Sequence, residues 1–318
     1  VEDDPDQANP QALTGHYGKE LETWRFAART TWALDEDRTL EAGFSYEDQS
    51  LFHPIVDRIL VDFDGPGPMP PVEVFSLIVD TDHREIGAML RYQQRLGAHD
   101  LLVGFNYGNG SVEGGNYRNL NGNRNGLTEQ VDNDSTSLEA FAVDRWRLND
   151  DWTLVYGAQV VRASLDVRTI HAVSGEVRNP NDDYTAANPR LGIIRALGAG
   201  TELFASLSRL FEAPTTFELE NDVRGSEATL DAMTGTVGEF GLRSAFEAES
   251  GARLQWEATA YYAAIKDEIL SVDDPAAPGN SLTTNIEDTI HAGLEAVVAA
   301  SFPLSGNPAH RLEPQVSA

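Results

Sequence analysis

The stretch ANPRLGIIRALGAGTELFASLSRLFEAPTTFEL, residues 187–219, decides the fold. Apolar side chains alternate with polar or small ones on both sides of a glycine-rich centre, at Leu191, Ile193 and Leu197 before it and at Leu203, Ala205 and Leu207 after it. A period of two is that of a β-strand with one apolar face, whereas a helix has a period of about 3.6. Gly198 and Gly200 suit a tight turn because glycine adopts positive φ without a steric penalty. The stretch therefore predicts a β-hairpin whose second strand ends near Pro214.

The same unit recurs along the chain, so we expect an all-β, antiparallel, up-and-down sheet of about eleven strands. Alternating apolar residues flank short turns at residues 35–38, 97–100, 149–151, 198–200 and 249–251. The last strand is expected near residues 290–300, and residues 302–310 resemble a further turn without a partner strand.

The connections between the hairpins have a different character. Residues 48–82, 108–134 and 168–188 are polar or rich in Gly, Asn or Pro, and we expect them to be long loops. Compact soluble domains seldom contain repeated loops longer than about 12–15 residues. Transmembrane β-barrels of the outer membrane combine short periplasmic turns with long extracellular loops, and closure of the barrel removes unpaired strand edges. The pattern therefore favours a transmembrane β-barrel, with the turn at residues 198–200 on the periplasmic side.

Composition restricts the functions that the chain can have. Its 23 Lys and Arg against 51 Asp and Glu give a formal net charge of −28, which argues against nucleic acid as a partner. The absence of Cys excludes disulfides and cysteine-ligated zinc. No run approaches the roughly 18 apolar residues of a membrane-spanning helix, and residues 1–10 lack the layout of a signal peptide. A barrel strand needs only about 9–11 alternating residues, so a membrane location stays open.

Eight aromatic residues lie toward the ends of predicted strands: Trp24, Trp32, Tyr46, Trp146, Trp152, Trp256, Tyr261 and Tyr262. We interpret them as an interfacial girdle, although aromatic residues also favour strands in general. Bacterial single-chain barrels have an even number of strands. About eleven strands therefore indicate a segment, residues 1–318, of a larger barrel.

Four stretches, in order, resemble signatures of the TonB-dependent outer-membrane receptors. They are EAFAVDRWRLNDDWTLVYGAQV at residues 139–160, LFASLSRLFEAPTTFEL at 203–219, LDAMTGTVGEFGLR at 230–243, and YYAAIKDEILSV with TTNIEDTIHAGLEA at 261–272 and 283–296. The resemblance implies a barrel of about 22 strands, a plug domain inside it and a TonB box that engages an inner-membrane energy-transducing complex. We expect the plug, the TonB box and the closing C-terminal strands to lie outside this sequence.

The resemblance implies a receptor in the outer membrane of a Gram-negative bacterium, in contact with lipid and lipopolysaccharide, which takes up a scarce nutrient. A ferric siderophore or other ferric chelate is the expected ligand. The stretches FHPIVD at residues 52–57 and TTNIEDTIHAGLEA at residues 283–296 resemble most the ferric-citrate and pyrroloquinoline-quinone receptor branch. Haem is disfavoured, since Glu212 replaces the Arg of an F-R-A-P motif. The alternatives are a non-iron ligand such as a quinone cofactor or cobalamin, a passive porin-like channel or surface adhesin, and a soluble β-sandwich.

No catalytic motif, metal-ligand spacing or cofactor fingerprint is present, so we expect neither an enzyme nor a bound cofactor. Cationic and aromatic residues in the expected loops are the candidates for ligand binding, because guanidinium groups bind carboxylates of anionic chelates. These candidates are His53, Arg58, Tyr117, Arg118 and Arg124.

Overall fold

The computed structural model describes residues 17–63, 65, 67, 68, 70–224, 229–273, 281–304 and 310–318. Fourteen strands of this part form one sheet, and each long strand pairs antiparallel with the next long strand along the chain. The eleven long strands are β1 (Glu20–Ala33), β2 (Arg38–Val61), β3 (Val72–Leu96), β4 (His99–Leu120), β5 (Asn123–Arg147), β6 (Trp152–His171), β8 (Asn181–Gly198), β9 (Thr201–Glu212), β10 (Met233–Glu247), β11 (Arg253–Asp273) and β12 (Ser281–Pro303). Three short strands, β7 (Val177–Arg178), β13 (Arg311–Leu312) and β14 (Gln315–Ser317), pair beside β6 and β12.

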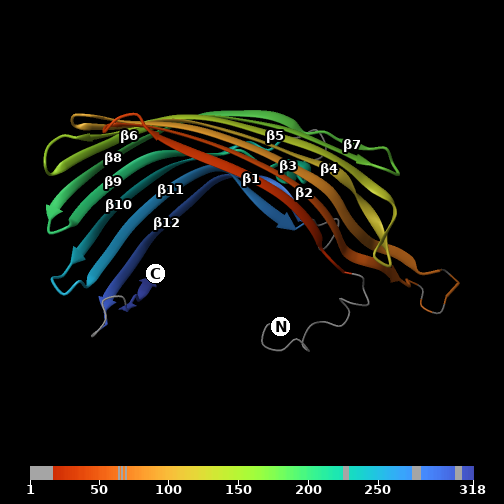
Figure 1. Cartoon of the computed structure of the whole chain (residues 1–318). Helices are drawn as coiled ribbons and strands as arrows, with labels where there is room; N and C mark the ends of the chain where they lie inside the picture. The colour runs from red at the N-terminus through yellow and green to blue at the C-terminus, as the bar shows by residue number, and fades with distance from the viewer. Residues whose placement is uncertain are drawn as a thin grey trace.

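The sheet bends into an arch whose strands run side by side from β1 at one edge to β12 near the other (Figure 1). β1 and β12 do not pair with each other in the described residues, so the sheet is an open half-barrel. Among the described residues, no helix is long and apolar enough to cross a membrane. The predicted fold class, an antiparallel up-and-down segment of a β-barrel with about eleven main strands, is confirmed.

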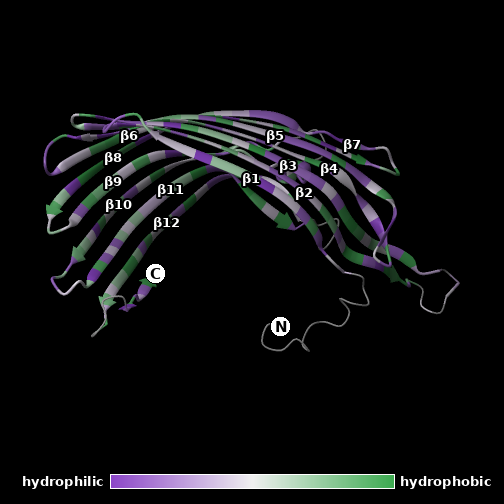
Figure 2. Ribbon diagram, in the orientation of Figure 1, coloured by the Kyte–Doolittle hydropathy of each residue, from purple (hydrophilic) through white to green (hydrophobic). Residues whose placement is uncertain are grey.

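Strand register separates an apolar face from a polar face across the whole sheet. One row on the apolar face runs through directly paired positions on successive strands, from Phe44 on β2 through Ala88 and Tyr107 to Leu138 on β5. Large apolar side chains on this face are exposed, including Phe26, Phe105, Leu191, Phe240 and Leu294. Figure 2 shows apolar and polar residues mixed along every strand, as the alternation requires. An exposed apolar band is what lipid contact demands of a barrel.

The opposite face is the concave one. Short side chains, ion pairs and polar groups lie on it, such as Arg25 with Glu47 and Arg29 with Glu41, both with N–O distances of 2.6 Å. The helix α2 (Thr216–Glu220) contacts both β6 and β12, which are far apart in the sheet. Only the concave side allows so short an element to reach both strands. The polar face therefore surrounds the interior of the barrel, and the apolar face is convex.

The turns of the predicted hairpins are confirmed. In the hairpin at the centre of the opening stretch, β8 and β9 pair Leu191 with Leu207 and Ile193 with Ala205. Gly198, Ala199 and Gly200 between them have φ values of 88°, 50° and 74°, so the two glycines take the left-handed conformation as expected.

The prediction of long loops at residues 48–82, 108–134 and 168–188 is wrong for most of their length. β2 and β3 pair from Arg38 with Gln94 as far as Val61 with Val72, and only residues 62–71 connect them. β4 and β5 pair up to Leu120 with Asn123 and are joined by Asn121 and Gly122. Backbone pairing does not require apolar side chains, and outside lipid both faces of a strand can be polar, so the apolar alternation fades while the ladder continues.

The end of the chain also differs from the prediction. The turn after β12 was expected to lack a partner, but Arg311–Leu312 and Gln315–Ser317 return along β12, pairing Val298 with Val316. Residues 305–309 of that turn lie outside the described residues.

Candidate functional site

The chain between β9 and β10 folds onto the concave face and forms what we call the strap, residues 213–224 and 229–232. Pro214 cannot donate a ladder hydrogen bond and ends the strand. Thr215 then caps α2: its hydroxyl accepts from the Glu218 N–H at 3.2 Å, and the Glu218 carboxylate accepts from the Thr215 N–H at 2.7 Å. This reciprocal capping box starts a helix of only five residues.

Apolar contacts hold the strap against β6 and β8. Leu219 and Leu230 are 1 % exposed and pack with Leu165, Val167 and Tyr184 in the main buried cluster of the described residues. Two hydrogen bonds also join the strap to these strands and fix its orientation. The Thr169 hydroxyl donates to Glu220 at 2.6 Å, and the Tyr184 hydroxyl donates to the Leu230 carbonyl oxygen at 2.7 Å.

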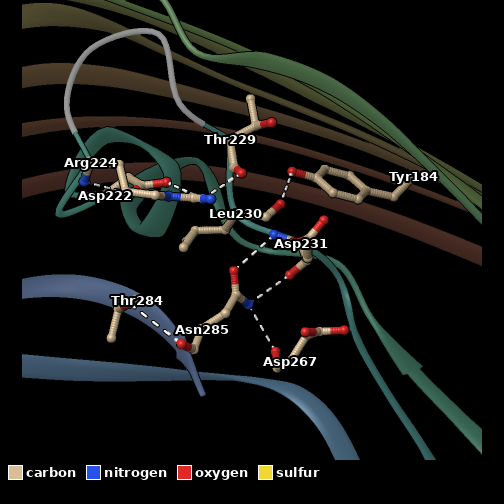
Figure 3. Close-up of polar contacts among 9 residues, drawn as sticks. All are labelled: Tyr184, Asp222, Arg224, Thr229, Leu230, Asp231, Asp267, Thr284 and Asn285. Atoms are coloured by element: carbon tan, nitrogen blue, oxygen red, sulfur yellow. Dashed lines mark hydrogen bonds and ion pairs between the residues drawn. The ribbon is translucent and has the colours of Figure 1, made fainter. Parts of the chain in front are cut away.

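Backbone and amide hydrogen bonds hold the strap on its other side, against β11 and β12. Thr283 donates its N–H to the Asn221 carbonyl oxygen at 2.7 Å and accepts from the Val223 N–H at 3.0 Å. The Asn285 amide donates to the carbonyl oxygens of Asp231 and Asp267 at 2.9 and 2.8 Å and accepts from the Asp231 N–H at 2.9 Å (Figure 3). The strap thus bridges two parts of the arch that are distant along the sheet.

Charge near the strap is mostly negative. The buried Asp222 carboxylate pairs with Arg224, whose Nε and Nη2 lie 3.0 and 2.8 Å from its two oxygens. Tyr184 lies among these groups, and burial raises the pKa of its hydroxyl well above the usual range. The charges of Asp182, Asp231 and Asp222 raise this pKa further, and Arg224 alone opposes them. An anion would therefore be unfavourable at this position.

The structure brings Tyr117 and Arg124 together. The Arg124 guanidinium lies 5.2 Å from the centre of the Tyr117 ring and 5.8 Å from that of Phe52, and its Nε is 2.7 Å from Asp80 Oδ2. Phe52 pairs with Asp80, and Asp80 pairs with Gly115. By strand alternation these three residues lie on the same convex face as Phe44. Tyr117 and Arg124 therefore pack at the tip of the β4–β5 hairpin on its outer side.

Arg118, the next residue along β4, points to the other face by strand alternation. Its Nε donates to Glu73 at 2.8 Å and its Nη2 donates to the second Glu73 oxygen at 2.5 Å, which is a bidentate pair. The hydrogen bond and charge of Arg118, aided by the charge of Arg58, hold the pKa of Glu73 below its usual value. His53 pairs in register with Val79, which pairs with Asn116, on the concave face.

The five predicted residues thus form two groups, Tyr117 with Arg124 and Arg58 with Arg118, and His53 stands apart from both. Sequence reasoning missed the strap, although the T-T-F-E run at residues 215–218 has the spacing of a capping box. Among the described residues, no group of three or more His, Cys, Asp or Glu side chains is arranged to hold a metal ion.

Comparison with known proteins gives a family and a fold. Residues 2–310 match the family described as "TonB dependent receptor-like, beta-barrel". Among proteins of curated function, none matches the sequence.

Three solved structures illustrate the likeness of fold. The copper transporter OprC has a TM-score of 0.63 and 18% identity, over 95% of this chain and 46% of its own. The ferric-catecholate import receptor Fiu from E. coli K12 has a TM-score of 0.64 and 13% identity, over 95% and 48%. The pyoverdine receptor FpvA from Pseudomonas aeruginosa PAO1 has a TM-score of 0.64 and 13% identity, over 95% and 54%. The chain thus spans about half the length of these proteins.

Proposed function

Because the chain belongs to the TonB-dependent receptor family, as part of its β-barrel, we propose that the parent protein actively imports a scarce nutrient bound as a ferric siderophore or other ferric chelate. The barrel family places the chain in the Gram-negative outer membrane. We propose that the short turns, such as residues 198–200, lie on the periplasmic side and the strap toward the cell exterior. Energy for uptake would come from a TonB complex acting through parts of the receptor other than this sheet.

The observation that carries the proposal is the combination of an apolar convex band with a folded strap inside the arch. The band fits the sheet to lipid, and the strap narrows the extracellular half of the interior. A strap of this kind would also narrow a passive channel, so the dependence of uptake on TonB distinguishes the two functions. A receptor gains a shaped surface on which a ligand can be recognised before transport.

Within this site we propose that His53 and Arg118, which register places toward the interior, contact the ligand, with Arg58 beside them. We propose that Tyr117 and Arg124 shape the outer side of the same mouth. Each of the two paired arginines could contribute to binding only while it also satisfies its own carboxylate, Glu73 or Asp80.

Growth experiments test the proposed function. A strain lacking the receptor gene is grown with individual ferric chelates as the sole iron source, and the gene is restored in a second strain. We expect at least one chelate whose use needs both the receptor and TonB. Uptake that needs the receptor but not TonB would indicate a passive channel, and use of every chelate without the receptor would contradict a role in iron uptake.

A further inference from the structure

The inner side of the strap offers an aromatic surface to the interior of the barrel. Phe217 and Leu219 are two residues apart on α2, which places them on nearly opposite sides of the helix. Leu219 is 1 % exposed against the wall, whereas Phe217 is 68 % exposed. Since the wall lies under Leu219, Phe217 projects away from the wall and toward the open concave space.

The strap is held rigidly enough to act as a recognition surface. It is fixed on one side by Thr169 and Tyr184 and on the other by Thr283 and Asn285, as described above. A side chain presented from such an element loses little conformational entropy when it binds a ligand. An exposed phenyl ring in this setting is suited to an apolar or planar group.

The charges around this surface are unbalanced. Near the strap the described residues include the carboxylates Glu129, Asp182, Glu218, Glu220, Asp222 and Asp231 and the guanidinium groups of Arg178 and Arg224. Arg224 is already paired with Asp222. Among the described residues, Glu129 and Glu220 accept hydrogen bonds from neutral donors alone, the Asn116 amide at 2.9 Å and the Thr169 hydroxyl at 2.6 Å.

Carboxylates thus outnumber guanidinium groups around the strap in the described part of the chain, which leaves the space before the strap negative.

We infer that the strap selects a neutral or cationic ligand with an apolar or planar face, which packs on Phe217 in the negative field of Glu129 and Glu220. This inference rests on the proposed function and narrows its ligand class, since a polyanionic chelate would be repelled. The ligand makes no covalent bond in this step. Phe217 supplies contact area, and the two carboxylates set the preferred sign of charge.

The sign of the electrostatic potential before the strap can be tested without knowledge of the ligand, by the reaction of an introduced cysteine with charged thiol reagents. The chain contains no cysteine of its own that would react with them. In the full-length receptor, with any cysteine elsewhere replaced by serine, Phe217→Cys is treated with a cationic trimethylammonium-ethyl and an anionic sulfonato-ethyl methanethiosulfonate. Val173→Cys, at a position 86 % exposed, is the reference, and Val223→Cys is a second reporter on the strap.

We expect the ratio of cationic to anionic reaction rates at Phe217→Cys to exceed the reference by about fivefold or more, since a potential of about one kT enriches a cation and depletes an anion alike. Combining Glu129→Gln with Glu220→Gln should bring the ratio down toward the reference. A ratio at or below the reference, or one unaffected by the two glutamine substitutions, would overturn the inference.

Ligand binding separates this inference from the proposed function. The purified full-length receptor is titrated with ferrichrome, which is neutral, ferrioxamine B, which is cationic, and ferric citrate, which is anionic. We expect the neutral or cationic complex to bind at least about tenfold more tightly, and Phe217→Ala to weaken that binding more than Phe217→Trp. Tightest binding of ferric citrate would overturn the inference. Failure of all three to bind, with a high thiol ratio, would contradict the ferric-chelate function and support the inferred field.

Discussion

Phe141 on β5 lies across Gly104, its directly paired partner on β4, on the concave wall of the sheet. A Cβ atom on Gly104 would overlap the end of the Phe141 ring. The same relationship joins Phe204 to Gly241 and Tyr261 to Gly293. Glycine at these positions leaves room for an aromatic ring to lie flat on the neighbouring strand, which is a known way to stabilise glycine within a sheet.

Gly104→Ala should therefore destabilise the barrel. The added methyl group forces the Phe141 ring off the wall, and overpacking of this kind costs about 1–3 kcal/mol. Gly108→Ala, four residues along the same strand, is the matched control because nothing lies within 4 Å of its Cβ position. Thermal unfolding of the purified receptor, followed by the shift of the folded band on gels, should show a lower midpoint for Gly104→Ala alone. Equal midpoints for the two variants would show that the ring has other space available.

The membrane-spanning part of the fold could be predicted from sequence because lipid forces a period of two on one face. Leu191, Ile193, Ala205 and Leu207 alternate for that reason, and the turn glycines between them are required by positive φ. Beyond the lipid this constraint ends. Residues 108–134 look like a loop by composition, yet Asn121–Gly122 within them is a strong hairpin signal, and both residues have positive φ, 54° and 78°.

The site was harder to predict because its contacts join distant parts of the chain. Tyr117 and Arg124 meet as a consequence of the turn at residues 121–122, so the hairpin signal could have indicated it. The bond from Asn285 to Asp231 spans 54 residues, and no local pattern encodes it. The pairing of Arg118 with Glu73 likewise depends on the register of β3 and β4, which composition does not reveal.

Asn285 should control the order of the strap. Asn285→Ala removes three hydrogen bonds, to the Asp231 N–H and to the carbonyl oxygens of Asp231 and Asp267. A buried donor or acceptor that is left without a hydrogen bond and without access to water costs about 1–3 kcal/mol. Hydrogen exchange of residues 213–224 and 229–232 should accelerate, and Asn285→Asp should accelerate it more, because a carboxylate would face two carbonyl oxygens.

Thr284→Ala is the control for that experiment. Within the described part of the chain, the Thr284 hydroxyl makes a single long hydrogen bond, 3.5 Å, to the Asn285 carbonyl oxygen. Its removal should leave exchange of the strap unchanged. If Asn285→Ala exchanged as slowly as the wild type, the packing of Leu219 and Leu230 alone would be sufficient to fix the strap.

Acid should loosen the ends of β3 and β4 through Glu73. The pKa of Glu73 is lowered in the folded protein, chiefly by its hydrogen bond to Arg118, from an ordinary value of 4.5. A lowered pKa means that the unfolded state binds the proton more readily, so the pair stabilises the fold above pH 4.5 and this contribution is lost as the pH falls through the folded-state pKa. Exchange of residues 72–78 and 116–120, corrected for intrinsic rates, should rise below pH 4.5. Glu73→Gln should lack this rise, and an identical pH profile in the two proteins would exclude Glu73 as its source.

The assignment of the convex face to lipid can be tested with two neighbouring residues of β8. Ile193 belongs to the apolar convex row, pairing with Ala205 and Leu154, and Ile194 faces the interior. Both lie a few residues from the turn at residues 198–200, close to the same depth in the membrane. An arginine at the lipid face costs about 2–4 kcal/mol at the bilayer midplane and about 0–1 kcal/mol near the interfaces, whereas an interior substitution leaves the charge in a polar environment. Ile193→Arg should therefore reduce the folding free energy in lipid bilayers by an amount between these limits, and Ile194→Arg should reduce it much less. The opposite ranking would require the sheet to curve with its other face outward.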